Sequence, residues 1–257
     1  MRASLIFLMM LSLLVTSCDR QKYPKQRKAV SKAYAKVHKP KVELKENRYN
    51  VAFLIMDGVY NTELTAPYDI FQHTQYRDSI KPMNVFTVAN TMDPIRTFEG
   101  MYILPDMDYT KTDLPKIDIL VIPSAEHHLD TDLEDKKMID FVQKVDQQAL
   151  FITSHCDGAF VLAQAGLLEG KVATTFPSDV EKMREMFPGV DVREDVLFVH
   201  HGKYITSAGG AKSFEAALYL AEHLYGEDIA RSLAKGLVID WELEEVPHVL
   251  VSKNEND

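Results

Sequence analysis

Cysteine is scarce in this 257-residue sequence, which contains only Cys18 and Cys156. Two cysteines cannot build a disulfide framework, so a fold held together by several disulfides is excluded. Each cysteine therefore needs its own explanation. The alternatives are a reactive or modified thiol and a small, buried, apolar side chain.

Long apolar runs are also lacking, and the N-terminal one, Leu5–Val15, has only 11 residues. A run of this length is too short to span a bilayer but is typical of the apolar region of a signal peptide, here preceded by Arg2. It ends in VTSC at residues 15–18, which resembles the lipobox of bacterial lipoproteins. The resemblance implies a signal peptide over residues 1–18, acylation of Cys18 and anchoring at the bacterial cell envelope. The alternative is an ordinary secretory signal with a chance cysteine.

Positive charge is scarce after Arg48. Residues 19–48 contain eleven Lys/Arg and three Asp/Glu, a balance of +8, and the residues after Arg48 carry −18 although the whole chain carries −9. An acidic body argues against binding to nucleic acid. Residues 19–48 show no sustained apolar period and are predicted to form a basic, flexible tether. This tether either rests on an anionic membrane or simply stays solvated.

Residues 49–242 are predicted to form one α/β domain, followed by a C-terminal tail over 243–257 whose end is frayed. No internal repeat or second domain is visible. Short apolar runs alternate with segments of helical period, which predicts a mostly parallel sheet with helices on both faces. The expected strands are 51–56, 84–89, 117–122 and 149–153, with an antiparallel pair formed by 191–199 and 204–206. The expected helices are 62–73, 131–147, 157–165, 178–186, 213–224 and 227–238.

Cys156 lies in the most informative segment, FITSHCDGAF at residues 151–160. An apolar strand runs through small residues into a helix, which predicts a tight strand-to-helix turn of the nucleophile-elbow type. Such a turn places the sulfur at the carboxyl end of a parallel sheet, where these folds bind ligands. A helix N-terminus favours thiolate, so we expect a thiol pKa below about 8.5. The alternative is a small buried side chain without chemistry.

Three blocks resemble the ThiJ/PfpI superfamily, and they occur in the family's order. They are CDGAFVLAQAGLLEGKVATT at 156–175, ELTAPYDIF at 63–71 and TSAGG at 206–210. The sequence is most similar to the branch that includes isonitrile hydratases and the amidotransferase-like domains of certain transcription regulators. The resemblance covers nearly all of residues 50–240. It implies a three-layer flavodoxin-like α/β sandwich, commonly a homodimer, that requires no metal or organic cofactor.

The resemblance also implies roles for individual residues. In this family an acid from the first helix hydrogen-bonds the elbow cysteine, and Glu63 occupies that position. A carboxyl beside a thiolate must keep its proton, so we expect a raised pKa for Glu63 and donation to the sulfur of Cys156. The alternative is a solvated helix residue. The backbone N–H groups of Asp157 and Ala125 are the candidate oxyanion donors.

Several positions depart from the family pattern. Family members often have two glycines where this chain has Ser124 and Ala125, and the Cβ of Ala125 narrows the approach to its N–H. Histidine is expected after the cysteine in protease-like members and after Thr175 in many relatives, but Asp157 and Phe176 stand there. The missing histidines argue against peptide hydrolysis, which needs a proton for the leaving amine. Isonitrile hydratases use aspartate at the position of Glu63, so their substrate cannot be carried over.

The other histidines have no assigned role. His127 and His128 follow the third strand, so either could reach the site, but each is expected to be a surface loop residue. His155 directly precedes the reactive cysteine. His200 and His201 are expected in a turn. No cluster has the spacing of metal ligands.

These residues support two hypotheses. The first is a hydratase- or hydrolase-like enzyme in which Cys156 attacks a small electrophile and Glu63 moves the proton. The second is a non-catalytic thiol redox sensor or ligand-binding lipoprotein at the envelope. Transcription regulation is disfavoured because the residues after Val238 leave no room for a helix-turn-helix pair, and an exported domain would not meet DNA.

Overall fold

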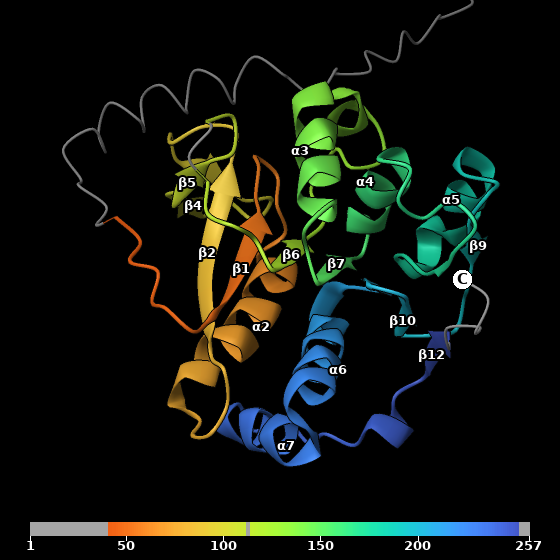
Figure 1. The fold of residues 1–257 in the computed structure, drawn as a ribbon. Helices are drawn as coiled ribbons and strands as arrows, with labels where there is room; N and C mark the ends of the chain where they lie inside the picture. The colour runs from red at the N-terminus through yellow and green to blue at the C-terminus, as the bar shows by residue number, and fades with distance from the viewer. Residues whose placement is uncertain (1–40, 112–113, 252–257) are drawn as a thin grey trace, which may run out of the picture. The chain divides into compact units, whose positions relative to one another are not determined.

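The structure, a computed structural model, describes residues 41–111 and 114–251 (Figure 1). The predicted signal peptide, including Cys18, and most of the predicted tether lie outside the described residues. The described end of that tether is part of the domain. Val42 and Leu44 pack against the hydrophobic core. Lys45 N–H donates to Asn84 Oδ1 (3.2 Å), and Asn84 Nδ2 donates to Lys45 O (2.9 Å). The domain therefore begins before Tyr49, and the predicted boundary at residue 48 is too late.

A central sheet of eight strands organises the domain. In spatial order its strands are β12 (His248–Val251), β10 (Phe198–His201), β11 (Tyr204–Ser207), β7 (Phe151–His155), β6 (Ile119–Ile122), β1 (Tyr49–Leu54), β2 (Met83–Ala89) and β5 (Met107–Asp108). Every neighbouring pair is parallel except β10 and β11. The mostly parallel sheet is thus confirmed.

Helices cover both faces of this sheet (Figure 1). One face carries α2 (Asn61–Gln72), α6 (Ser213–Tyr225) and α7 (Glu227–Gly236), and the other carries α3 (Lys136–Asp146), α4 (Gly158–Gln164) and α5 (Val180–Met186). Side chains alternate along each strand, so Val51 and Phe53 of β1 enter one core and Ala52 and Leu54 enter the other. These are the predicted three layers of a flavodoxin-like sandwich.

Short elements complete the fold. Two small pairs lie outside the main sheet: β3 (Ile95–Arg96) is antiparallel to β4 (Tyr102–Ile103), and β8 (Val172–Ala173) is parallel to β9 (Asp191–Val192). The 3-10 helices are η1 (His73–Tyr76), η2 (Thr131–Glu134), η3 (Pro177–Asp179), η4 (Gly210–Lys212) and η5 (Leu243–Glu245).

Three local predictions need correction. The helix expected over 131–147 is divided into η2 and α3, because the Asp135 side chain accepts the N–H groups of Lys137 and Met138 and begins a new helix. The strand expected over 191–199 is also divided, between β9 and β10. His200 and His201 both lie within β10 rather than in the turn that follows it.

The predicted C-terminal tail is wrong for residues 243–251. Residues 248–251 form β12, which pairs in parallel with β10 and so covers an otherwise open edge of the sheet. The His248 ring stacks on Phe198 with a centroid distance of 5.0 Å and an angle of 7°. A strand of four residues with one long-range partner leaves little periodic signal in the sequence.

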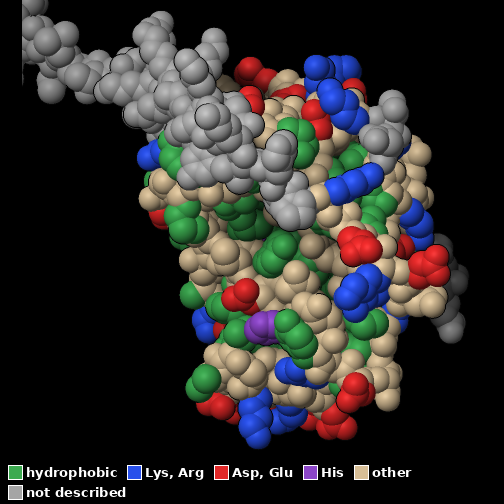
Figure 2. Space-filling model, turned by 90° about the vertical axis from the view of Figure 1, so that its left-hand side faces the viewer, with side chains coloured by type: hydrophobic (Ala, Val, Ile, Leu, Met, Phe, Trp, Pro, Cys, Tyr) green, Lys and Arg blue, Asp and Glu red, His purple; other side chains and the backbone are tan. Residues whose placement is uncertain are grey.

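The face where the sheet edge at β2 and β5 points outward is mixed in charge, with apolar side chains exposed between the charged ones (Figure 2). Acidic and basic side chains lie near one another at the top, right and bottom of that view (Figure 2). The visible part of this face therefore does not gather the negative charge of the domain. Within residues 41–111 and 114–251, no helix combines the length and apolar character needed to cross a membrane.

Candidate active site

Cys156 stands at the predicted elbow between β7 and α4. Its φ of 53° lies in the left-handed region that side chains other than glycine rarely adopt. The backbone is held there because Cys156 N–H donates to Ser207 O (2.9 Å) and Gly209 lies against it. A Cβ added at Gly209 would come within 2.4 Å of Cys156 Cβ. Strained backbone of this kind is typical of functional sites, and the elbow is confirmed.

Glu63 reaches the elbow from α2 and is buried, with 5% of its surface exposed. Its Oε2 accepts the N–H of Ser124 (3.0 Å), and its Oε1 accepts the N–H of Gly210 (3.0 Å). The carboxyl is also hydrogen-bonded to the Cys156 thiol. Glu63 is therefore not a solvated helix residue, and segments far apart in the sequence meet at one carboxyl group.

The protonation of this pair differs from the expectation. Burial raises the pKa of Glu63, as expected, although its hydrogen bonds to the two backbone N–H groups and to the thiol act in the opposite direction. Burial also raises the pKa of the Cys156 thiol, and the charges of Glu63 and Asp157 raise it further. The predicted lowering of the thiol pKa is wrong, because α4 offers only a seven-residue helix against burial and two carboxyls. Burial therefore favours the neutral form of both the thiol and the Glu63 carboxyl.

Asp157 brings a second carboxyl to the sulfur, whereas the sequence suggested a role only for its backbone N–H. The N–H hydrogen-bonds the sulfur and lowers the pKa of the thiol. The side chain is 8% exposed and lies beside Thr175, whose Oγ is 3.3 Å from Asp157 Oδ1. Burial, followed by the charge of Asp179, raises the pKa of Asp157 to about 7. The clue in the sequence was its position, since histidine follows the cysteine in protease-like relatives.

Ala125 is not available as an oxyanion donor in this structure. Its N–H donates to His128 Nδ1 (3.2 Å). His128 is fully buried, so the prediction that it is a surface loop residue is wrong. Because Nδ1 accepts, Nε2 carries the proton and faces Met56 Sδ (3.3 Å) and Asp132 Oδ2 (4.0 Å). Burial lowers the pKa of His128 to about 3, which keeps the ring neutral.

The neighbouring histidines have structural surroundings. His155 is 1% exposed, and its Nδ1 lies 2.9 Å from Ser207 Oγ, beneath the elbow. Burial lowers the pKa of His155 to about 3. His127 is 42% exposed and its Nδ1 lies 3.3 Å from Asp130 Oδ1, so the surface prediction is confirmed for this residue.

The Ser124 hydroxyl is another candidate donor, since the Ala125 N–H is already bonded to His128. Its N–H donates to Glu63, and its C=O accepts the N–H of Tyr60 (3.0 Å), so its backbone is held on both sides. The hydroxyl is buried and makes no full hydrogen bond, yet it is close enough to the Cys156 sulfur to lower the pKa of the thiol. A buried donor without a partner is costly and is a natural place for a ligand atom to bind.

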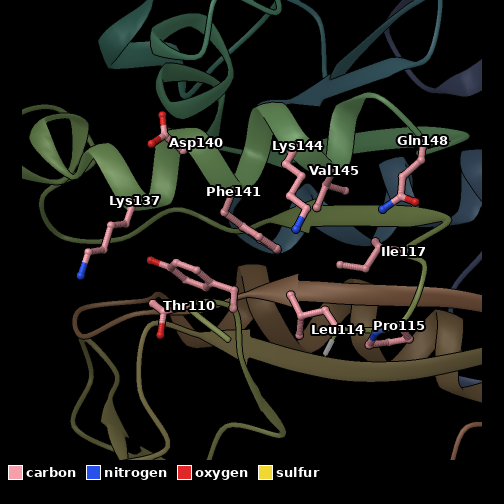
Figure 3. Close-up of a pocket in the computed structure, with 11 residues that line it drawn as sticks. Thr110, Leu114, Pro115, Ile117, Lys137, Asp140, Phe141, Lys144, Val145 and Gln148 are labelled. Atoms are coloured by element: carbon pink, nitrogen blue, oxygen red, sulfur yellow. The ribbon is translucent and has the colours of Figure 1, made fainter. Parts of the chain in front are cut away.

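A surface hollow lies away from Cys156, between α3 and residues 109–117. It has a volume of about 460 Å³. Lys137 and Lys144 project toward it from α3, whereas Asp140 points away (Figure 3). Its lining includes no residue of the Cys156 site. In the described part of the chain, no group of three His, Cys, Asp or Glu side chains is arranged to hold a metal ion.

Comparison with known proteins agrees with this geometry. Residues 49–223 match the model of the DJ-1/PfpI family. Isonitrile hydratase from Pseudomonas putida is 29% identical over 181 residues, which cover 70% of this chain and 74% of that protein. Protein dj-1beta from Drosophila melanogaster is 29% identical over 157 residues, which cover 60% of this chain and 82% of that protein.

Solved structures agree on the fold. The crystal structure of Drosophila melanogaster DJ-1beta superposes with a TM-score of 0.65 at 23% identity, covering 76% of this chain and all of that chain. A ThiJ/PfpI family protein from Pseudomonas syringae gives a TM-score of 0.66 at 22% identity, covering 76% of each chain. The matched residues 49–223 include Glu63, Ser124, Cys156 and Asp157 and make up about two thirds of the chain. The chain therefore belongs to the DJ-1/PfpI family.

Proposed function

We propose that the protein is a cysteine-dependent enzyme that adds water to a small electrophile, such as an isonitrile, an aldehyde or a strained carbonyl compound. The observation that carries this proposal is the Glu63 carboxylate, held by two backbone N–H groups beside the thiol of a strained elbow cysteine. The 29% identity to isonitrile hydratase supports it. An activated thiol with an adjacent base is the arrangement that nucleophilic catalysis needs.

In the first step, Glu63 takes the S–H proton while the sulfur of Cys156 forms a bond to the electrophilic carbon. The same proton then passes from Glu63 to the substrate atom that gained the electron pair. The backbone N–H of Asp157 and the hydroxyl of Ser124 face the developing charge. After these two proton transfers the substrate is bound covalently to the sulfur as a neutral adduct.

In the second step, written for an isonitrile adduct, which keeps a C=N bond, Asp157 takes a proton from water as the water oxygen attacks the same carbon and the C=N electron pair moves to nitrogen. A pKa of about 7 suits Asp157 to this role, because it is partly ionised at neutral pH. Asp157 then gives its proton to the nitrogen, the C–S bond breaks with its electron pair returning to sulfur, and Glu63 carries the O–H proton of the adduct to the sulfur. For an isonitrile, the net reaction consumes one water and gives an N-substituted formamide.

Replacement of the nucleophile tests the proposal. Cys156→Ala should abolish turnover of every accepted electrophile while the far-UV and near-UV circular dichroism of the protein stay unchanged. A panel of isonitriles and aldehydes assayed by loss of substrate is the measurement. Unchanged turnover in the variant would overturn the assignment of Cys156.

A thiol redox sensor is the second candidate, favoured by the two hydrogen-bond donors that lie beside the Cys156 sulfur. The Asp157 N–H and the Ser124 hydroxyl could bind a sulfinate, and the protein is 29% identical to dj-1beta over 157 residues. Mild peroxide followed by mass spectrometry separates the two functions. A stable gain of two oxygens on Cys156, with no turnover of any electrophile, would favour the sensor.

We also propose that the protein is a lipoprotein of the bacterial cell envelope and acts as a homodimer. The anchoring proposal rests on the lipobox-like residues 15–18 and the basic segment after them. The dimer proposal rests on the resemblance to the family. Mass spectrometry of the mature N-terminus, which should carry acyl chains on Cys18, and sedimentation equilibrium of the purified protein test the two proposals separately.

A further inference from the structure

Five residues lie around the Cys156 site, and we take them as its entrance, which we call the mouth: Tyr60, Phe98, Glu99, Glu126 and Asp157. The Tyr60 and Phe98 rings stack with a centroid distance of 4.6 Å and an angle of 30°, and Phe98 is 46% exposed. Burial raises the pKa of the Tyr60 phenol, and the charges of Cys156, Asp157, Glu63 and Glu126 raise it further. The Tyr60 phenol therefore lies close to both the reactive sulfur and the carboxyls around it.

The acidic residues of the mouth lie close to the elements that carry the site. Glu99 Oε2 accepts the N–H of Asn61 (3.1 Å), which brings it to the start of α2, and its charge acts on Glu63. The N–H of Glu126 donates to Gly58 O (3.0 Å). The charge of Asp179 acts on Asp157. The charges that act most strongly on the pKa values of Tyr60, Glu63, Cys156 and Asp157 are those of carboxyls and of the thiol, and no Lys, Arg or His is among them.

The inner end of the same site points to what binds there. The Ser124 side chain is fully buried, its Oγ makes no full hydrogen bond, and it lies beside the sulfur. Such a hydroxyl can donate to an acceptor atom on a bound molecule. An anionic acceptor would face Glu63 and Asp157 at close range, where like charges repel strongly because little water screens them. An uncharged acceptor meets no such penalty.

We propose that the mouth selects uncharged or cationic electrophiles and rejects anionic ones. This inference rests on the proposed function, because it assumes that Cys156 reacts with electrophiles. The acidic side chains lower the local concentration of anions and raise that of cations. The exposed face of the Tyr60–Phe98 pair accepts either a neutral apolar group or a cation. The substrate class is therefore a small electrophile without a carboxylate or phosphate.

Two alkylating reagents of nearly equal size test the inference. Iodoacetamide is neutral and iodoacetate is anionic. In both reactions the sulfur forms an S–C bond, the C–I bond breaks, iodide leaves, and Glu63 takes the thiol proton. The ratio of their rates at Cys156, divided by the same ratio for a small uncharged thiol, isolates the effect of the site. We expect this normalised ratio to exceed about tenfold at low salt and to fall toward one in about 1 M salt.

Variants locate the effect in the mouth. Glu99→Gln and Glu126→Gln should each lower the normalised ratio severalfold, because each removes one negative charge near the path. Glu244→Gln, at an exposed carboxylate in η5, is the matched control and should leave the ratio unchanged. A cationic methanethiosulfonate should likewise modify Cys156 faster than its sulfonate analogue. Mass spectrometry of the Cys156 peptide identifies the modified residue, and Cys156→Ala provides the blank.

The outcomes separate the inference from the proposed function. A fast reaction with iodoacetamide and a slow one with iodoacetate supports both. Equal normalised rates at low salt overturn the inference about substrate charge and leave the nucleophile in place. Failure of Cys156 to react with either neutral or charged reagents overturns the proposed function, and the inference with it.

Discussion

The Cys156 site has two sides that are built differently. The inner wall, formed by Glu63, Ser124 and Gly209, is buried, and its atoms are held by backbone hydrogen bonds or by close backbone contact. The mouth is partly exposed: Phe98 and Glu99 face solvent, Tyr60 and Glu126 are half-buried, and Asp157 is buried. Backbone contacts fix geometry, whereas surface charges act over distance and are screened by salt. The inner wall therefore determines how the thiol reacts, and the mouth determines which molecules reach it.

The two carboxyls beside the sulfur show the same difference. Glu63 accepts two backbone N–H groups, which favour its carboxylate form and partly offset the effect of burial on its pKa. Asp157 has the Thr175 hydroxyl and the thiol as its neighbours, and its pKa rises to about 7. Glu63 is suited to accept the thiol proton at once, and Asp157 is suited to exchange protons with water.

The largest effect should follow loss of the inner carboxylate. Glu63→Gln removes the base, so turnover should fall by about 10²- to 10⁴-fold. The same change removes the largest charge that raises the thiol pKa, so the pH profile of Cys156 alkylation should move to lower pH. Asp69→Asn, at an exposed position of the same helix, is the control. A profile that moves to higher pH would mean that a protonated Glu63 stabilises thiolate.

The next largest effect should come from crowding the inner wall. Gly209 has φ 78° and ψ −155°, and a Cβ there would meet Cys156 N at 2.7 Å. Gly209→Ala should lower the free energy of unfolding by about 3 kcal/mol or more, from backbone strain and overlap together. Gly210→Ala is the matched control, with φ 57° and nothing within 4 Å of its Cβ; it should cost about 1 kcal/mol. Equal losses in urea unfolding would contradict the role of the contact.

The elbow and the layers were predictable because their signals are local. An apolar strand, small residues and a helix start around Cys156 define the turn, and strand–helix alternation defines the sandwich. The partnership of Glu63 with Cys156 was predictable only through family resemblance, because 93 residues separate them in the chain. The contribution of residues 42–48 and of β12 was missed, since it depends on contacts with residues far away in the sequence.

The oxyanion region was not predictable from residue types. Ala125 keeps its N–H, but which atom accepts it depends on the side-chain orientation of His128, three residues later. The Ser124 hydroxyl and the Asp157 carboxyl acquire their roles from burial beside one sulfur. Burial of a polar loop residue is decided by tertiary packing, which no local pattern encodes.

A smaller effect should follow neutralisation of the mouth carboxyl Asp157. Its pKa is raised to about 7 in the folded protein, so its stabilising contribution is complete below pH 4 and is lost as pH rises through 7. Asp157→Asn should remove this loss, and the variant should gain stability relative to the wild type between pH 4 and 8. The gain is about 1.4 kcal/mol for each unit of pKa shift. Urea unfolding across this range measures it, with the exposed Asp240→Asn as control. A difference independent of pH would contradict the raised pKa.

The smallest effect should come from the Ser124 hydroxyl, and its sign is informative. The hydroxyl makes no full hydrogen bond, so Ser124→Ala should leave the free energy of unfolding unchanged or raise it by up to about 1 kcal/mol. The hydroxyl lowers the thiol pKa, so its loss should move the alkylation profile of Cys156 to higher pH, opposite to Glu63→Gln. If the serine were only structural, Ser124→Ala would lower the free energy of unfolding and leave the pH profile of Cys156 alkylation unchanged. Retention of a buried, unpaired donor beside a nucleophile is explained if a bound substrate supplies the missing acceptor.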